Sequence, residues 1–465
     1  MTRKPAQVNT ALPSLRARPV AERAAEGKAL RQRSPRTAHA TYEPPADRAD
    51  PIEILIASNE GRDPDLVPIR HGRMLASSFA FYRGAAAIMA SDLAGTPTTG
   101  VMLQACGDAH LLNFGGFATP ERRIVFDIND FDETSIAPWE WDVKRLVASF
   151  VLAARSNGFD EDAGREAARS AAQSYRERMA AYGAMPILDA WYSYLDLESL
   201  VESAKDQQAA AYYRRRIKLA TEQSAHEKEF ARLTFQEGAS PRIKDDPPLI
   251  FHTEITEGRF RRNAEKGLAR YAASLPPERR VLVERFEPVD AAIKVVGVGS
   301  VGTFCAIVLL MAGNGDPLFL QLKEARESVL EPFAGAAPFD HHGERVVAGQ
   351  RLMQSASDIF LGWFTGLEGG EFYVRQLRDA KIKPVVETMT AQNLVGYART
   401  CGWALARAHA RSTDAVALTG YLGKSSAFEN ALAGFAVAYA DQTERDHQAM
   451  IEAVREGRLE VRTET

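Results

Sequence analysis

Apolar residues recur at helical spacing along most of this chain. In residues 137–158, Val143, Leu146, Val147 and Phe150 fall on one face of a helix. The same spacing predicts further helices over residues 77–94, 343–364 and 391–415, in most of residues 160–290, and near the C-terminus. Together these segments predict a large helical body.

A second region has the pattern of a small antiparallel sheet. From Ile293 the chain runs through a short apolar stretch, a glycine-rich loop, the apolar β-branched run TFCAIVLLM, the turn AGNGDP and a final run, LFLQLKEA. Further strands are predicted over 101–106 and 371–379. Helices with a separate group of sequential strands predict an α+β fold.

The composition divides the chain into four segments. Residues 1–50 hold ten Lys and Arg, five Asp and Glu, six Pro and almost no large apolar side chains. Such a segment buries too little surface to offset its ordering entropy, so we expect a mostly disordered basic arm, with a helical turn near 21–33. We expect a helical lobe at 51–290, a β-rich lobe at 291–385, and helices at 386–465 that pack back on the helical lobe.

Charge and cysteine content limit the possible partners. The net charge of −4 gives no indication of a nucleic-acid partner or of a membrane surface. The three cysteines are far apart in sequence, which favours reduced thiols in the cytoplasm. No apolar run reaches transmembrane length. The oligomeric state is left open.

Candidate chemistry is concentrated in residues 104–133. Six polar side chains occur there between apolar runs: Asp108, His110, Asn113, Asp127, Asp130 and Asp132. Carboxylates with one amide oxygen, at the end of a strand, suit a hard cation such as Mg²⁺. A pair of turns rich in Asp and Asn is the alternative interpretation, because these residues favour turns.

The glycine loop is the second candidate region. It contains Gly297, Gly299, Ser300 and Gly302, and it is followed by a strand and not by the helix of a dinucleotide-binding motif. Two strands later comes Lys323. The order strand, glycine loop, strand, turn and a further strand that carries one lysine is typical of a kinase lid that covers the phosphates of ATP.

Other interpretations of this region remain open. The glycines also suit a plain β-hairpin, and Lys323 an exposed strand position. If the lid interpretation holds, we expect Glu344 to pair with Lys323, with Glu327 and Glu331 as rivals.

The segment CGDAHLLN resembles the catalytic-loop pattern HGDxHxxN of the aminoglycoside-phosphotransferase and choline-kinase branch of the protein-kinase-like fold. The resemblance implies that Asp108 is the catalytic base, that His110 supports the loop, and that Asn113 and Asp130 hold Mg²⁺. Cys106 departs from the leading His. The lid here follows the catalytic loop by roughly 190 residues, whereas in those kinases it precedes it. The resemblance therefore implies a two-lobed, circularly permuted kinase-like fold.

From about residue 51 to the C-terminus the sequence also resembles the bacterial domain-of-unknown-function family 2252. The segments CGDAHLLNFGGF, FDINDFDET, PWEWDVKRL and KVVGVGSVGT carry this resemblance. It implies a fold and no particular substrate.

These observations predict a phosphotransferase that uses ATP and Mg²⁺ to modify an unknown hydroxyl acceptor, either a small molecule or a protein. One alternative is a metal-dependent hydrolase with Asp108, His110, Asp127 and Asp130 as ligands. The other is a nucleotide-binding pseudokinase without catalysis.

Overall fold

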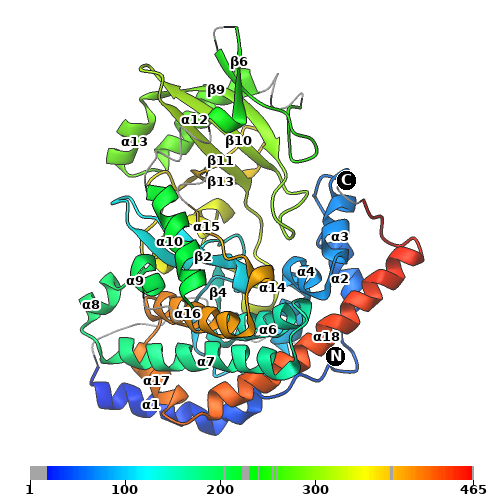
Figure 1. Cartoon of the computed structure of the whole chain (residues 1–465), viewed down its shortest axis with the longest axis vertical. Helices are drawn as coiled ribbons and strands as arrows, with labels where there is room; N and C mark the ends of the chain where they lie inside the picture. Colours follow the sequence, from blue (N-terminus) through cyan, green and yellow to red (C-terminus); the bar gives the residue numbers. More distant parts are fainter. Residues whose placement is uncertain are drawn as a thin grey trace.

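The computed structural model describes residues 18–202, 206–221, 230–238, 240–253, 256, 260–377 and 381–462. It is a mixed α+β structure, as the sequence predicts. A twisted antiparallel sheet stands at one end of the molecule and a helical body at the other (Figure 1).

Six antiparallel strands form the main sheet, in the spatial order β12-β13-β11-β10-β9-β8. The strands are β8 (Ile250–Phe251), β9 (Phe286–Lys294), β10 (Cys305–Ala312), β11 (Pro317–Glu324), β12 (Gly362–Thr365) and β13 (Glu371–Gln376). The predicted order of strand, glycine loop, strand, turn and strand is confirmed by β9, β10 and β11. In this register Lys323 lies between Cys305 of β10 and Tyr373 of β13.

The sheet begins earlier in the chain than predicted, since β8 and most of β9 precede residue 291. Two helices between these strands, α12 (Phe260–Ala273) and α13 (Pro277–Val283), belong to the same apolar cluster as the sheet. Tyr271 and Leu275 pack there with Val308 and Leu320. Helix α13 begins at Pro277, with Pro276 as the residue before its first turn.

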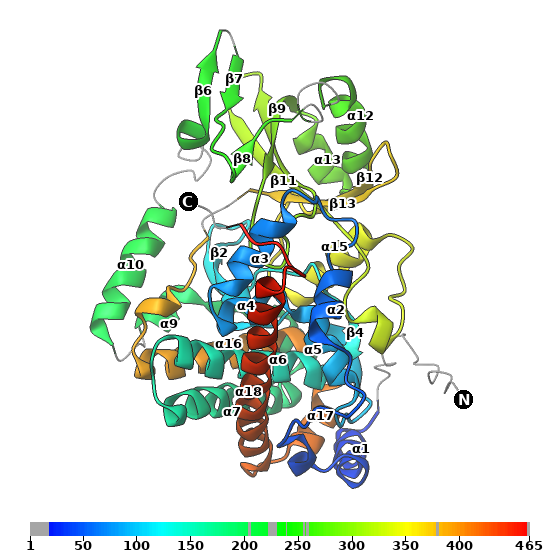
Figure 2. The same ribbon diagram turned by 90° about the vertical axis from the view of Figure 1, so that its right-hand side faces the viewer.

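The helical body is built around one buried helix, α6 (Trp139–Ser156), in which every residue from 139 to 154 is buried. Trp139 at its start stacks on Tyr175, with ring centroids 5.7 Å apart. The helices around it are α7 (Glu161–Ala184), α16 (Ala391–Ala410), α17 (Ala415–Leu422) and α18 (Ala427–Arg455) (Figure 2). The C-terminal helices pack on the helical body, as predicted.

Short strands position the loops between the sheet and α6. β1 (Met102–Ala105) pairs with β4 (Ser135–Pro138), and β2 (Phe114–Ala118) forms a hairpin with β3 (Ile124–Ile128). Residues 106–113 therefore leave β1 close to residues 129–134, which lead into β4.

The remaining elements are α1 (Val20–Arg33), α2 (Pro51–Ala57), α3 (Val67–Leu75), α4 (Ser78–Gly84), α5 (Ala86–Ala94), α8 (Ile187–Tyr192), β5 (Leu195–Asp196), α9 (Leu197–Glu202), α10 (Gln207–Thr221), β6 (Thr234–Glu237), β7 (Ser240–Ile243), α14 (Glu331–Ala334) and α15 (His342–Met353). The helix predicted over 77–94 is divided into α4 and α5 at Ala85. The helix predicted over 343–364 ends at Met353, because the backbone amide of Ser355 donates instead to the carboxylate of Asp127, at 2.8 Å.

The prediction of a disordered arm is wrong for residues 20–50; residues 1–17 lie outside the described part. Helix α1 packs along α17, and Gly27 allows a contact so close that a Cβ there would stand 1.7 Å from the carbonyl oxygen of Ala417. Arg31 and Arg36 donate to the carbonyl oxygens of Tyr421 and Leu422, at 2.8 and 2.7 Å. Arginine hydrogen bonds and small residues thus order this segment without large apolar side chains.

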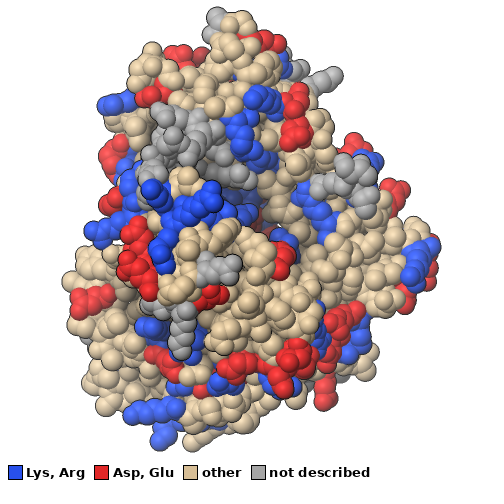
Figure 3. All heavy atoms as spheres, in the orientation of Figure 1, with Lys and Arg blue, Asp and Glu red and all other residues tan. Residues whose placement is uncertain are grey.

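Helix α10 carries a basic face. Arg214, Arg215 and Lys218 are exposed there, and Lys and Arg gather on the corresponding part of the surface (Figure 3). Within the described part of the chain, we find no helix with the length and apolarity needed to cross a bilayer.

Candidate active site

A cavity of about 420 Å³ lies where the sheet meets the helical body. Both stretches singled out in the sequence contribute to its wall. The predicted site residues that line it are Asp108, His110, Asn113, Asp130, Gly297, Gly299 and Ser300. The catalytic-loop and glycine-loop segments are therefore neighbours in space.

Asp142 of α6 anchors the loop that follows β1. The carboxylate of Asp142 accepts hydrogen bonds from the backbone amides of Cys106 and Gly107, at 2.7 and 3.0 Å. Gly107 has a φ of +84°, and a Cβ there would stand 2.1 Å from the carbonyl oxygen of Glu133. Only glycine fits this position. The Nε2 of His409 donates to the same carboxylate at 3.1 Å, and so His409 belongs to this support.

Asp108 follows this turn and is held by an arginine that the sequence did not identify. The Nε of Arg145 donates to Oδ1 of Asp108 at 2.6 Å. Arg145 lies over the ring of Tyr82, 4.4 Å from its centroid, and donates to the Tyr82 carbonyl oxygen at 3.0 Å. Arg145 therefore holds the Asp108 carboxylate in one orientation at the cavity wall.

His110 is a buried neighbour of Asp108 and caps the next turn. Its Nδ1 accepts a hydrogen bond from the backbone amide of Leu112 at 3.2 Å, and its Nε2 lies 3.7 Å from Oδ2 of Asp108. Burial lowers the pKa of His110 to about 4; Asp108 opposes this shift, and Arg83 and Arg145 add to it. The imidazole is therefore neutral at pH 7, and its contacts are those of a residue that supports the loop.

Asn113 and Asp130 present oxygen atoms to the same cavity. The side-chain amide of Asn113 donates to the carbonyl oxygen of Asp108 at 2.6 Å, which fixes its orientation. Oδ1 of Asp130 is buried and has no hydrogen-bond partner within the described residues. A buried carboxylate oxygen without a hydrogen-bond donor, from a residue that lines the same cavity as Asn113, fits a hard cation.

The side chain of Asp130 is ionised although burial opposes its charge. Lys323, Arg375 and Lys381 outweigh burial and hold its pKa below the usual value. Within the described ranges, no three carboxylate, His or Cys side chains come close enough together to hold a metal ion alone. Mg²⁺ bound by Asn113 and Asp130 would therefore complete its coordination with phosphate oxygens and water.

Lys323 of β11 lies against the carboxylates of Asp130 and Asp132, which we call the acidic wall. Its ammonium group is buried, hydrogen-bonded to Asp132 and 3.6 Å from Oδ1 of Asp130. The Tyr373 hydroxyl on the neighbouring strand donates to the other oxygen of Asp132. Burial alone would lower the pKa of Lys323, but Asp130 and Asp132 raise it well above the usual value.

The prediction that Glu344 pairs with Lys323 is wrong, since the partners of Lys323 are Asp132 and Asp130. Helix α15 directs the next residue, Arg345, toward the site instead. Arg345 donates to the carbonyl oxygens of Asp132 and Arg326, at 3.0 and 2.7 Å. The rival Glu331 is engaged by Arg345, at 3.4 Å.

The glycine loop spans the connection between β9 and β10 and is held by the segment that joins α2 and α3. Gly297 and Gly302 have φ values of +72° and +87°, a conformation that favours glycine. Arg62 donates to the carbonyl oxygen of Val301 at 2.6 Å, and the Asp63 amide donates to that of Gly302 at 2.8 Å. The connection is therefore an anchored loop and not the tight turn of a plain β-hairpin.

Ser300 links the glycine loop to the acidic wall. Its hydroxyl donates to Oδ2 of Asp132 at 3.4 Å. Asp132, which the sequence placed among the six candidate side chains without a role, thus contacts Lys323, Tyr373 and Ser300. Its place beside Asp130 in the sequence was the available signal.

Asp127 is not at this site. It is fully buried and paired with Arg407 at 2.8 Å, and the Ser355 hydroxyl donates to it at 2.7 Å. The four-ligand set of the hydrolase alternative is therefore not assembled, because Asp127 serves as a structural ion-pair partner.

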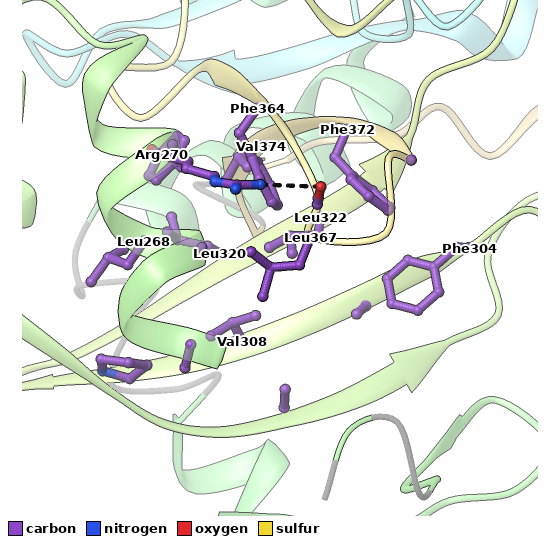
Figure 4. A pocket seen from close by; sticks show the side chains of 18 of the residues that line it. Leu268, Arg270, Phe304, Val308, Leu320, Leu322, Phe364, Leu367, Phe372 and Val374 are labelled. Carbon is purple, nitrogen blue, oxygen red and sulfur yellow. Dashed lines mark hydrogen bonds between the residues drawn. The ribbon is translucent and has the colours of Figure 1, made fainter. Parts of the chain in front are cut away.

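A second cavity, of about 480 Å³, lies between α12 and the sheet (Figure 4). Apolar side chains such as Leu268, Val308, Leu320 and Phe364 line it, and Arg270 at its edge donates to the carbonyl oxygen of Thr365 at 3.0 Å. None of the predicted site residues lines this cavity, so we place the candidate chemistry in the polar one.

The fold and the site together define an α+β protein with a charged cavity between a sheet and a helical body. The chain belongs to DUF2252, a family described as uncharacterised proteins conserved in bacteria, whose model matches residues 62–453. This confirms the family resemblance stated from the sequence. No curated protein and no solved structure matches the chain.

Proposed function

We propose that this protein is a phosphotransferase that uses ATP and Mg²⁺ to phosphorylate a hydroxyl group of an unidentified acceptor. One observation carries the proposal: the segment with Asp108 and Asn113 and the glycine loop line a single cavity, although roughly 190 residues separate them. The circularly permuted kinase-like fold is part of this proposal.

Carboxylates outnumber arginines in the cavity lining, so binding of a triphosphate there would depend on Lys323 and on a bound Mg²⁺. Transfer of a phosphoryl group depends mainly on positioning and on neutralising phosphate charge. Lys323 would contact the phosphates, beneath the backbone of the glycine loop. Mg²⁺ held by Asn113 and Asp130 would supply further neutralisation.

Asp108 is assigned to the acceptor side. In a loose transition state the acceptor hydroxyl needs orientation more than early removal of its proton. An oriented carboxylate provides this orientation and accepts the proton as the new bond forms. Arg145 holds Asp108 in place for that role.

Calorimetric titration of the purified protein with ATP in the presence of Mg²⁺ tests the proposal. We expect saturable binding to one site, strongly weakened by Lys323→Met. The matched control is Lys424→Met, a change at an exposed lysine in the connection between α17 and α18, which should bind as the wild type does. Absence of ATP and ADP binding to folded wild-type protein would refute both the phosphotransferase and the pseudokinase interpretations.

A further inference from the structure

One arginine in the cavity lacks a partner. Within the described part of the chain, the side chain of Arg83 makes no hydrogen bond or ion pair, and its Nε is buried without an acceptor. The neighbouring arginines Arg62 and Arg70 do make hydrogen bonds, although the Nε of Arg70 is also buried without an acceptor. Arg62 donates to the carbonyl oxygens of Ser58 and Val301, and Arg70 to the side chain of Asn59 and the carbonyl oxygen of Gly84.

Arg83 lies where the two functional loops meet. Its carbonyl oxygen is 3.5 Å from the position a Cβ would take on Gly299, at the tip of the glycine loop. Its charge also acts on His110, and that of Asp108 acts on Arg83. Arg83 therefore stands between the glycine loop and the catalytic loop.

A guanidinium group in this setting favours an anion. Arginine stays protonated at neutral pH, and a partly buried charge without a partner is costly. Burial lowers the pKa of Arg83, and Asp108 and Glu387 offset this only in part. Among the described residues that line the cavity, Arg83 is a cation whose side chain has no hydrogen bond or ion pair, so its guanidinium is free to take a new negative charge.

We propose that Arg83 binds the phosphoryl group during its transfer, as a further catalytic residue that rests on the function proposed above. In that step a bond forms between the acceptor oxygen and the γ-phosphorus, and the bond from the γ-phosphorus to the bridging oxygen breaks. The bonding electrons leave with ADP, and the hydroxyl proton passes to Asp108. The guanidinium of Arg83 binds the negatively charged phosphoryl oxygens throughout this transfer.

The position between the loops favours the transferred group over the other phosphates. The phosphate donor must lie under the glycine loop, and the acceptor must lie beside Asp108. The phosphoryl group that moves from donor to acceptor therefore passes between the two loops, where Arg83 lies. A fixed cation at that place stabilises the transition state more than bound ATP.

The test uses a mimic of the transferred group and needs no acceptor. The affinity for Mg²⁺-ADP is measured by calorimetry with and without aluminium fluoride, for wild type, Arg83→Ala, Arg83→Lys and Arg285→Ala. Arg285 is exposed and lies outside the cavity lining. Melting temperatures establish that each variant is folded.

We expect aluminium fluoride to tighten ADP binding in wild type and Arg285→Ala. In Arg83→Ala the tightening should fall by roughly 10- to 100-fold, as expected for lost hydrogen bonds to a charged group, with ADP affinity alone unchanged. Arg83→Lys should retain part of it.

Equal tightening in wild type and Arg83→Ala would overturn the inference, as would an equal loss of ADP affinity without fluoride. Binding of ADP to wild type without any tightening would also overturn it, while leaving nucleotide binding intact. Failure of wild type to bind ADP at all would remove the proposed function, and the inference with it.

Discussion

Lys323 and Asp132 form a hydrogen-bonded ion pair between the sheet and the loop that follows β3. A single buried ammonium serves two carboxylates, since Asp130 lies 3.6 Å away. The pair joins the two parts of the molecule at the floor of the candidate active site. It therefore has consequences for both stability and ligand binding.

Lys323→Met should destabilise the protein by about 2 kcal/mol. Removing one partner of a fully buried pair costs about 3–5 kcal/mol, and the 27% exposure of the Asp132 side chain reduces that cost. Urea denaturation measures the change. Lys323→Met combined with Asp132→Asn should lose less than the sum of the two single changes; strict additivity would contradict a direct interaction.

His110 should make stability depend on pH. Its pKa in the folded protein is about 4, below the ordinary value of 6.5, so between these values the unfolded chain binds more protons. Stability should therefore rise with pH from 4 to 6.5, by up to about 3 kcal/mol from this group. His110→Asn keeps an acceptor for the Leu112 amide and removes the titration. Its stability should change less steeply over this window, and an unchanged slope would contradict the assignment.

Gly107→Ala should be far more damaging than Gly158→Ala. Both glycines have positive φ, +84° and +74°, so both substitutions strain the backbone by about 1–2 kcal/mol. A Cβ at Gly158 meets nothing within 4 Å, whereas at Gly107 it meets the Glu133 carbonyl oxygen at 2.1 Å. Thermal denaturation of the two variants isolates the effect of the clash. Similar melting temperatures would show that the loop can move aside at little cost.

The sequence predicted the strands around the glycine loop and the loop after β1 because both depend on local patterns. Apolar β-branched runs define β10 and β11, and Gly107 and Asp108 occur in a short motif. The family and the α+β class were also predicted correctly. These features need few long-range contacts to be recognised.

Partners chosen by tertiary packing could not be predicted. Glu344 and Arg345 are adjacent in sequence, and only the rotation of α15 decides that Arg345 faces the site. Asp127 and Asp130 look alike in a string of carboxylates, but Arg407, 280 residues away, engages only Asp127. Order in α1 depends on carbonyl groups at the end of α17, which composition does not show.

Asp108→Asn should leave binding of Mg²⁺-ATP nearly unchanged and reduce phosphoryl transfer by roughly 10²–10⁴-fold. The amide keeps the size of the side chain but cannot accept the proton. Until an acceptor is known, slow ATP hydrolysis or autophosphorylation, followed by release or incorporation of labelled γ-phosphate, is the measurable reaction. Loss of Mg²⁺-ATP binding in this variant would place Asp108 among the nucleotide ligands instead.

The most direct test of the account is the effect of Mg²⁺ on ATP affinity, measured by calorimetry with Mg²⁺ or with EDTA. The account predicts that Mg²⁺ tightens ATP binding in wild type and in Asp108→Asn, and that Asp130→Asn loses most of this gain, because a neutral amide replaces a charged oxygen ligand. An equal gain in wild type and Asp130→Asn would contradict the magnesium assignment, and no binding of ATP by folded wild-type protein would contradict the phosphotransferase account as a whole.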